Sequence, residues 1–268
     1  MSALRHAVRR LREIIWPRQV ICLCCGRPTR GDHLCRACAG SLDALRVTGP
    51  VCEICGHPLE DGQCVFCDMT GVATLRSVWF YQDECRALVR LLKYGGVADA
   101  AQPMADGMAD LARTLNLPPE TVITWPTMPI HRRRTRGIDH GELLARAVSD
   151  RLGFPARQLM ARSEDIAAEP QASKNRAERL TRLQGAFSCP EQLRHPVLLI
   201  DDVLTTSATA TTCSECLLDA GAPSVTVITA TQARGHHQTN EKEGLRDVVE
   251  EAAGRVPVNP DDRERRVG

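Results

Sequence analysis

Four Cys-x-x-Cys pairs stand within residues 22–67 of the 268-residue chain, and no other feature restricts what a segment of it can fold into so strongly. Two thiols separated by two residues can reach one ion from a single tight turn, and a second such turn completes a closed tetrahedral zinc site. The spacing therefore predicts two structural zinc ions, because the pairs form two consecutive sets. The expected ligands are Cys22, Cys25, Cys35 and Cys38 for one ion, and Cys52, Cys55, Cys64 and Cys67 for the other.

The remaining cysteines are interpreted differently. Cys24 offers an alternative thiol within the first pair, so a different ligand assignment with the same zinc content stays open. Cys213 and Cys216 also have Cys-x-x-Cys spacing, but they fall in an expected helix with no second pair nearby. We expect these two, like Cys85 and Cys189, to be free thiols in the interior.

The composition favours a folded, cytoplasmic protein. Apolar residues make up 43% of the chain, and no stretch approaches the roughly twenty apolar residues of a membrane span. The net charge of +1 excludes a protein that coats nucleic acid with its whole surface. Residues 1–19 are expected to form an amphipathic helix, with Leu4, Val8, Leu11 and Ile15 opposite arginines. We expect its apolar face to dock on the protein itself, with a nucleic-acid or membrane contact as the alternative.

From about Gly71 strands alternate with amphipathic helices, which is typical of a mostly parallel sheet flanked by helices. The expected strands are Ser77–Tyr81, Val122–Pro126, Val197–Val203 and Ser224–Thr231. The expected helices are Glu84–Lys93, Gln102–Leu115, Gly141–Leu152, Lys174–Leu183 and Thr209–Ala220. The domain organisation that follows is a loop-like double zinc ribbon at 20–70, an α/β domain at 71–234 and a disordered tail at 235–268.

The most informative stretch is Val197–Thr209, which reads VLLIDDVLTTSAT. Its apolar half predicts a buried strand, with Asp201 and Asp202 at the carboxyl end, where α/β sheets bind ligands. The following turn leads into a helix, whose first N–H groups favour a phosphate. The residues of this turn are Thr205, Thr206, Ser207, Ala208 and Thr209. The two carboxylates suit ribose hydroxyls or a magnesium ion that bridges to a diphosphate.

This stretch resembles the ligand loop of the type I phosphoribosyltransferases, in which two acidic residues precede a Thr-Thr-Gly-x-Thr-like turn. The resemblance implies that Asp201 and Asp202 are the catalytic acids and that the turn residues bind phosphoribosyl diphosphate together with magnesium. Ser207 stands where the family usually has glycine, which serves there because the turn needs a positive φ or a close approach of phosphate. The implied fold class is a type I phosphoribosyltransferase-like α/β domain behind a zinc-ribbon module, and turnover stays open.

Three further stretches resemble the ComF family of competence-associated proteins. They are Leu92–Gly96 (LKYGG), Pro129–Gly137 (PIHRRRTRG) and Gln171–Phe187 (QASKNRAERLTRLQGAF). With the cysteine pairs and the ligand loop, the resemblance covers about residues 20–232 in the family's order. The chain departs from the family at Ile138–His140, which reads Ile-Asp-His instead of Phe-Asn-Gln. The resemblance implies a role in natural transformation, with a helicase-like partner from the DNA-uptake or recombination machinery.

The middle of the chain is locally basic, with twelve Lys and Arg residues against seven Asp and Glu residues between Trp125 and Gly185. His131, Arg132 and Lys174 are candidate contacts of a diphosphate, because charge-assisted hydrogen bonds hold phosphate oxygens strongly. A contact with single-stranded DNA and a solvated basic loop are the alternatives.

Two functions follow. The first is a ComF-like protein with a phosphoribosyl-diphosphate-binding fold that handles imported single-stranded DNA. The second is an active phosphoribosyltransferase of nucleoside metabolism with an unknown acceptor. A zinc-ribbon adaptor is a third interpretation, which the ligand loop disfavours.

Overall fold

The computed structural model describes residues 20–64, 72, 74–129, 137–162, 186–204 and 207–233. The chain divides into two compact units, of which Arg36–Ala233 is the second, while the described part of the first is residues 20–35. The helix expected at 1–19, the helix expected at Lys174–Leu183 and the tail expected at 235–268 lie outside the described residues.

The first unit holds one cysteine knuckle between two short strands. Strands β1 (Val20–Ile21) and β2 (Pro28–Thr29) pair antiparallel. Between them the N–H of Cys22 donates to the carbonyl of Arg27 at 2.8 Å, and the N–H of Gly26 donates to that of Cys22 at 2.8 Å. These bonds close the tight turn that the Cys-x-x-Cys spacing predicts.

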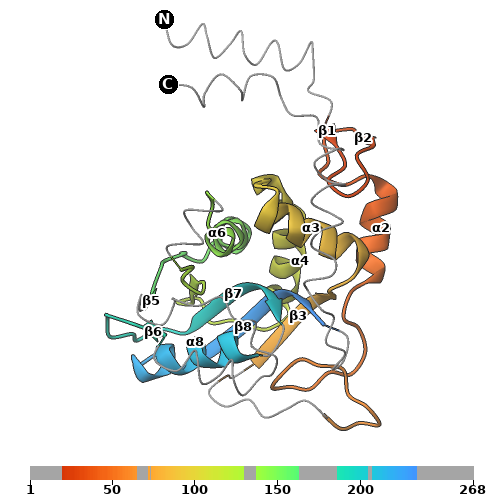
Figure 1. The fold of residues 1–268 in the computed structure, drawn as a ribbon. Helices are drawn as coiled ribbons and strands as arrows, with labels where there is room; N and C mark the ends of the chain where they lie inside the picture. The colour runs from red at the N-terminus through yellow and green to blue at the C-terminus, as the bar shows by residue number, and fades with distance from the viewer. Residues whose placement is uncertain are drawn as a thin grey trace, which may run out of the picture. The chain divides into compact units, whose positions relative to one another are not determined.

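The second unit is built on a four-stranded parallel sheet (Figure 1). Its strands, in spatial order, are β3 (Thr74–Phe80), β8 (Val225–Gln232), β7 (Val197–Leu204) and β4 (Val122–Thr124). All three pairings are parallel. The apolar run that begins β7 is fully buried, as expected for an inner strand covered on both faces. The expected α/β class with a parallel sheet is confirmed.

Helices cover both faces of this sheet (Figure 1). Helices α3 (Asp83–Tyr94), α4 (Ala101–Arg113) and α6 (His140–Leu152) lie on one face, and α8 (Ala208–Asp219) lies on the other. A short 3-10 helix, η1 (Ala98–Ala100), leads into α4. The expected helices around these positions agree with the structure to within one or two residues at each end, as helix boundaries usually do.

The structure also contains elements that the sequence pattern did not reveal. Helix α2 (Arg36–Ala44) lies in the segment that we expected to be loop-like throughout, and that expectation is wrong there. This helix forms because its Cys38 and Leu42, four residues apart, bury one face. The strands β5 (Ala161–Arg162) and β6 (Phe187–Ser188) pair antiparallel beside α8.

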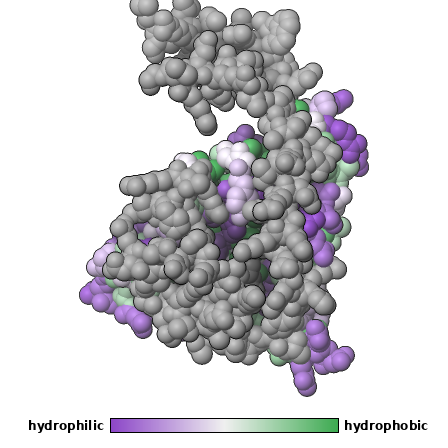
Figure 2. All heavy atoms as spheres, viewed as in Figure 1, coloured by the Kyte–Doolittle hydropathy of each residue, from purple (hydrophilic) through white to green (hydrophobic). Residues whose placement is uncertain are grey.

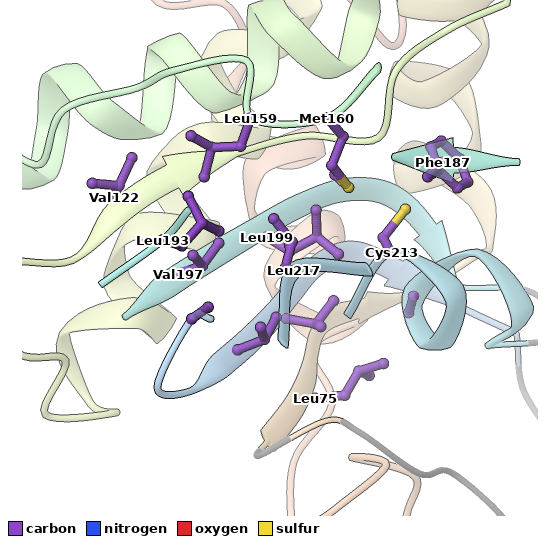
Figure 3. Close-up of a cluster of buried hydrophobic side chains, with 14 of the residues drawn as sticks. Leu75, Val122, Leu159, Met160, Phe187, Leu193, Val197, Leu199, Cys213 and Leu217 are labelled. Atoms are coloured by element: carbon purple, nitrogen blue, oxygen red, sulfur yellow. The ribbon is translucent and has the colours of Figure 1, made fainter. Parts of the chain in front are cut away.

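A hydrophobic core lies between the sheet and α8 (Figure 3). Leu199 of β7 faces Cys213 and Leu217 of α8 there, and Met160 and Phe187 close the side nearest β5 and β6. On the outside, hydrophilic side chains cover most of the described surface visible in Figure 2, and hydrophobic ones appear only in small patches. Among the described residues no helix is long and apolar enough to span a membrane.

Candidate functional site

The first four cysteines meet at one point. The sulfur atoms of Cys22, Cys25, Cys35 and Cys38 lie within 4.8 Å of one another, and those of Cys25 and Cys35 are 3.7 Å apart. A zinc–sulfur bond of about 2.3 Å in a regular tetrahedron separates neighbouring sulfurs by about 3.8 Å. The donor set therefore fits a structural zinc ion with no open position.

The second cysteine cluster is described for three of its four expected ligands. Cys52, Cys55 and Cys64 bring their sulfurs within 4.8 Å of one another, with 3.4 Å between those of Cys55 and Cys64, while Cys67 lies outside the described residues. Burial alone would raise the pKa of the Cys52 thiol, but the backbone N–H groups of Cys55 and Ile54 and the neighbouring thiols outweigh it and lower the pKa to about 7. Burial raises the pKa of Cys55 well above its ordinary value. This contrast favours a thiolate at Cys52, the form that binds zinc.

The second knuckle is attached to the sheet. The carbonyl of Ile54 accepts a hydrogen bond of 2.8 Å from the N–H of Leu75 in β3, and the guanidinium of Arg76 donates to the carbonyls of Cys52 and Glu53 at 3.1 and 2.9 Å. Cys52 and Cys55 are also members of the core cluster beneath the sheet. The second zinc site is thus part of the edge of the α/β domain.

The acid pair stands at the carboxyl end of β7, as expected. The side chain of Asp202 is 4% exposed, and its two oxygens lie 2.8 Å from Nζ of Lys93 and 3.0 Å from Nε2 of His140. Burial alone would raise the pKa of Asp202, but the charge of Lys93 and the contact with His140 hold it well below its ordinary value. Asp202 is therefore a buried carboxylate held between two basic side chains.

Each of these basic side chains is delivered by a helix end. Lys93 is in the last turn of α3, where Leu88 and Leu92 are fully buried and fix the helix against the sheet. His140 is the first residue of α6, and the N-cap Asp139 accepts the N–H of Glu142 at 3.1 Å. The next residue of α6, Gly141, lies close to the ring of Trp125, so the helix start packs directly on the loop after β4.

Asp201 has a different environment from its neighbour. It is partly exposed, and its Oδ1 accepts the N–H of Asp202 at 2.8 Å. Burial and the negative charge of Asp202 raise its pKa from 3.8 to about 7, against the opposing charge of Lys93. A carboxyl group with this pKa binds a proton or a cation readily near neutral pH.

The turn after the acid pair begins α8. Ser207 is the N-cap residue and has φ 57° and ψ −11°, in the left-handed region. Its carbonyl accepts the N–H of Thr211 at 2.8 Å, its side chain makes no capping hydrogen bond, and Ala208 is buried behind it. The family's glycine at this position is therefore explained by backbone conformation, and the serine adopts the same conformation.

Not all of the expected site residues are described. Asp201, Asp202, Ser207, Ala208 and Thr209 lie together between the end of β7 and the first turn of α8. Those outside the described residues are Thr205, Thr206, His131, Arg132, Lys174 and Cys67. Lys93 was in a stretch that resembles the ComF family, and His140 was in the triplet where the chain departs from that family, but no sequence pattern indicates that they meet Asp202.

Comparisons with known proteins agree with these features. Residues 11–70 match the double zinc ribbon domain family. The competence protein ComFC of Bacillus subtilis (strain 168) is 27% identical over 204 residues, which cover 71% of this chain and 80% of that protein.

Solved phosphoribosyltransferase structures are more distant. The glutamine phosphoribosylpyrophosphate amidotransferase from B. subtilis is 17% identical with a TM-score of 0.36, covering 52% of this chain and 30% of that one. A hypoxanthine phosphoribosyltransferase from Staphylococcus aureus is 12% identical with a TM-score of 0.32, covering 50% and 64%. The chain thus spans less than two thirds of either enzyme.

The match to ComFC extends through most of both chains, and the structure itself has the clustered cysteines of a zinc ribbon and a parallel sheet with an acid pair. The double zinc ribbon match and the similarity to ComFC together support the assignment of the chain to the ComF family.

Proposed function

We propose that this ComF protein binds a ligand of the phosphoribosyl diphosphate class at the carboxyl end of β7 and acts in the handling of imported single-stranded DNA. The observation that supports the ligand site is the sequence of features along one short segment. A buried strand carries an acid pair near its carboxyl end, the chain passes through a left-handed residue at Ser207, and a twelve-residue helix begins at Ala208.

This segment offers one group for the phosphate of a sugar phosphate and another for its sugar. The first N–H groups of α8 carry the positive end of the helix dipole and favour a phosphate. Asp201, a few residues earlier, provides carboxylate oxygens that suit ribose hydroxyls. The same oxygens fit a magnesium ion, which would neutralise the diphosphate when bound.

The role in DNA handling is supported by the relationship to a competence protein and by charge. The segment from Trp125 to Gly185 has an excess of positive residues in a chain whose net charge is +1. A DNA contact there would be mainly electrostatic, because aromatic residues are only 3% of the chain and base stacking needs them. A helicase-like protein of the uptake or recombination machinery is the partner we propose.

Phosphoribosyl transfer is the second candidate function. The observation that favours it is the φ of 57° at Ser207, because the serine preserves the turn that glycine usually provides. In such a reaction the chain's own residues would position the sugar and stabilise the departing diphosphate. The acceptor would have to enter beside the same strand end.

Calorimetric titration with phosphoribosyl diphosphate, with and without magnesium, tests the ligand site. We expect saturable binding that magnesium strengthens and that Asp201→Asn weakens by about ten- to a hundredfold, because hydrogen bonds to a charged group are lost. Exposed Asp110, which pairs with Arg113 on α4, supplies the control Asp110→Asn. Equal affinity for wild type and Asp201→Asn would contradict the proposed site.

A further inference from the structure

The two adjacent acids of β7 face opposite sides of the sheet. Successive side chains of a strand alternate between its faces. Asp202 reaches Lys93 and His140 on the side of α3 and α6. Asp201 stands two residues after Leu199 and so shares the strand face on which Leu199 lies against Cys213 and Leu217 of α8, although its charge also acts on Lys93. Only Asp201 therefore lies on the side of the turn at Ser207.

Asp202 is held by side chains within the protein, although its Oδ2, 3.0 Å from Nε2 of His140, makes no hydrogen bond of regular geometry. Each of its carboxylate oxygens contacts a basic side chain, and its main-chain carbonyl accepts the hydroxyl of Thr231 at 3.2 Å. For Asp202 to bind a ligand hydroxyl, one of these contacts would have to be released at a side chain that is only 4% exposed. Breaking a buried pair leaves an uncompensated charge, which is strongly unfavourable.

The contacts of Asp202 join segments that are far apart in the chain. Lys93 ends the helix after the edge strand β3, and His140 begins the helix after β4. Both basic side chains meet one carboxylate at the end of β7. Buried ionic groups contribute little net stability compared with apolar packing, but they fix a specific geometry well.

We infer that the two acids have separate roles: Asp202 is a positioning residue that, with Lys93 and His140, fixes the ends of α3 and α6 to β7, and Asp201 alone presents its carboxylate to the sugar of the ligand. This inference rests on the proposed ligand site. It replaces the sequence-based expectation that both acids contact the ligand.

Single substitutions separate the two roles. Asp202→Asn should lower the thermal midpoint of unfolding by about 6–20 °C, because the partly buried Lys93 loses its nearest counter-charge. Asp201→Asn should leave the midpoint unchanged or raise it, and should weaken phosphoribosyl diphosphate binding about ten- to a hundredfold. A variant Asp202→Asn that keeps the wild-type midpoint and loses affinity as Asp201→Asn does would overturn the inference.

A double-mutant cycle tests whether Lys93 acts through Asp202. Lys93→Met should destabilise the protein as Asp202→Asn does, and the combination of both should cost much less than the sum, because no buried charge is left unpaired. Lys93→Arg keeps the charge and should retain phosphoribosyl diphosphate affinity within about threefold, whereas Lys93→Met should not. Such a rescue would not occur if the residue served packing alone.

The outcomes distinguish this inference from the proposed function. If wild-type protein fails to bind phosphoribosyl diphosphate, the proposed ligand site is wrong, yet the cycle between positions 93 and 202 still reports on the contact. Additive losses in that cycle would overturn the positioning role of Asp202, whatever the ligand result.

Discussion

Gly56 of the second cysteine knuckle lies directly against Leu75 of the edge strand β3, so that a Cβ atom at position 56 would overlap the carbonyl oxygen of Leu75. Gly56 also has φ +68°, in the left-handed region. The knuckle thereby covers the open edge of the sheet, and an uncovered edge strand would expose unpaired backbone groups. The zinc ribbon and the α/β domain are consequently linked through backbone contact at this glycine.

Gly56→Ala should destabilise the protein by about 2–4 kcal/mol, from left-handed strain and overpacking together. The matched control is Gly62→Ala, since Gly62 has φ +77° but nothing within 4 Å of its added Cβ. This control carries the strain alone and should cost only about 1–2 kcal/mol. Denaturant unfolding measures both values, and equal losses in the two variants would contradict the contact with Leu75.

The two cysteine clusters should bind two zinc ions per chain. Elemental analysis of washed protein should fall from two ions to one in Cys25→Ser and in Cys55→Ser, since each variant removes one ligand of a closed site. The Cys55 variant should lower the unfolding temperature of the α/β domain as well, because Cys55 belongs to its core. Zinc content below one ion in the wild type would contradict the assignment.

Ser207→Gly should stabilise the protein by about 0.5–1 kcal/mol, because glycine adopts the positive φ of this position without steric cost. The gain is this small because glycine also loses more backbone entropy on folding. Ser207→Ala is the control, and it should match the wild type because the serine makes no capping hydrogen bond. Thermal unfolding of the three proteins provides the comparison. A glycine variant less stable than the alanine variant would show that the turn is not strained.

Stability should depend on pH through Asp201. Its pKa is raised from 3.8 to about 7 in the folded protein, so the folded state binds the proton more tightly than the unfolded chain. Protonated Asp201 therefore makes its full contribution to the free energy of unfolding below the unfolded-state pKa. This contribution is lost as the pH rises toward 7, and the loss is at most about 4 kcal/mol. Asp201→Asn should remove this loss. The free energy of unfolding of the variant should therefore rise relative to that of the wild type between about pH 5.5 and 8, a range in which the zinc ligands stay bound.

Denaturant midpoints across that range measure this effect. Asp202 does not obscure it, because its lowered pKa places its own titration below pH 3.8. A constant difference between Asp201→Asn and wild type would contradict the raised pKa.

The sequence was sufficient to predict those parts of the structure that depend on local pattern. The apolar run before Asp201 predicted the buried strand, and the knuckle spacing predicted the first thiol cluster and the three described thiols of the second. The left-handed turn at Ser207 was anticipated because a resemblance placed glycine there. Each of these features is decided by residues close together in the chain.

The rest of the site depends on contacts between distant segments. No periodicity within α3 or α6 indicates that Lys93 and His140 reach the same carboxylate, because that depends on the strand order and helix ends. Helix α2 was missed because Gly40 and the surrounding turn residues hide a single buried face of Cys38 and Leu42. Strands of two residues, such as β5, carry no alternation from which to predict them.

Binding of single-stranded DNA should follow the arginine run Arg132–Arg134, which lies outside the described residues. If about three to five phosphates are neutralised, log affinity should fall against log salt with a slope of roughly −2 to −3.5. Replacing the three arginines by alanine should flatten this slope and weaken all oligonucleotides by a similar factor, because phosphate contacts carry no base information.

A charge-matched control decides whether the position of these arginines matters. Replacing exposed Arg86, Arg113 and Arg194 by alanine removes the same total charge elsewhere. The slope of this control should stay near that of the wild type, since a chain with net charge +1 attracts DNA only through a local patch. If Arg132–Arg134 serve the diphosphate instead, their removal should abolish phosphoribosyl diphosphate binding and leave the DNA salt slope unchanged. That result would exclude the arginine run as the DNA contact and favour the transferase function.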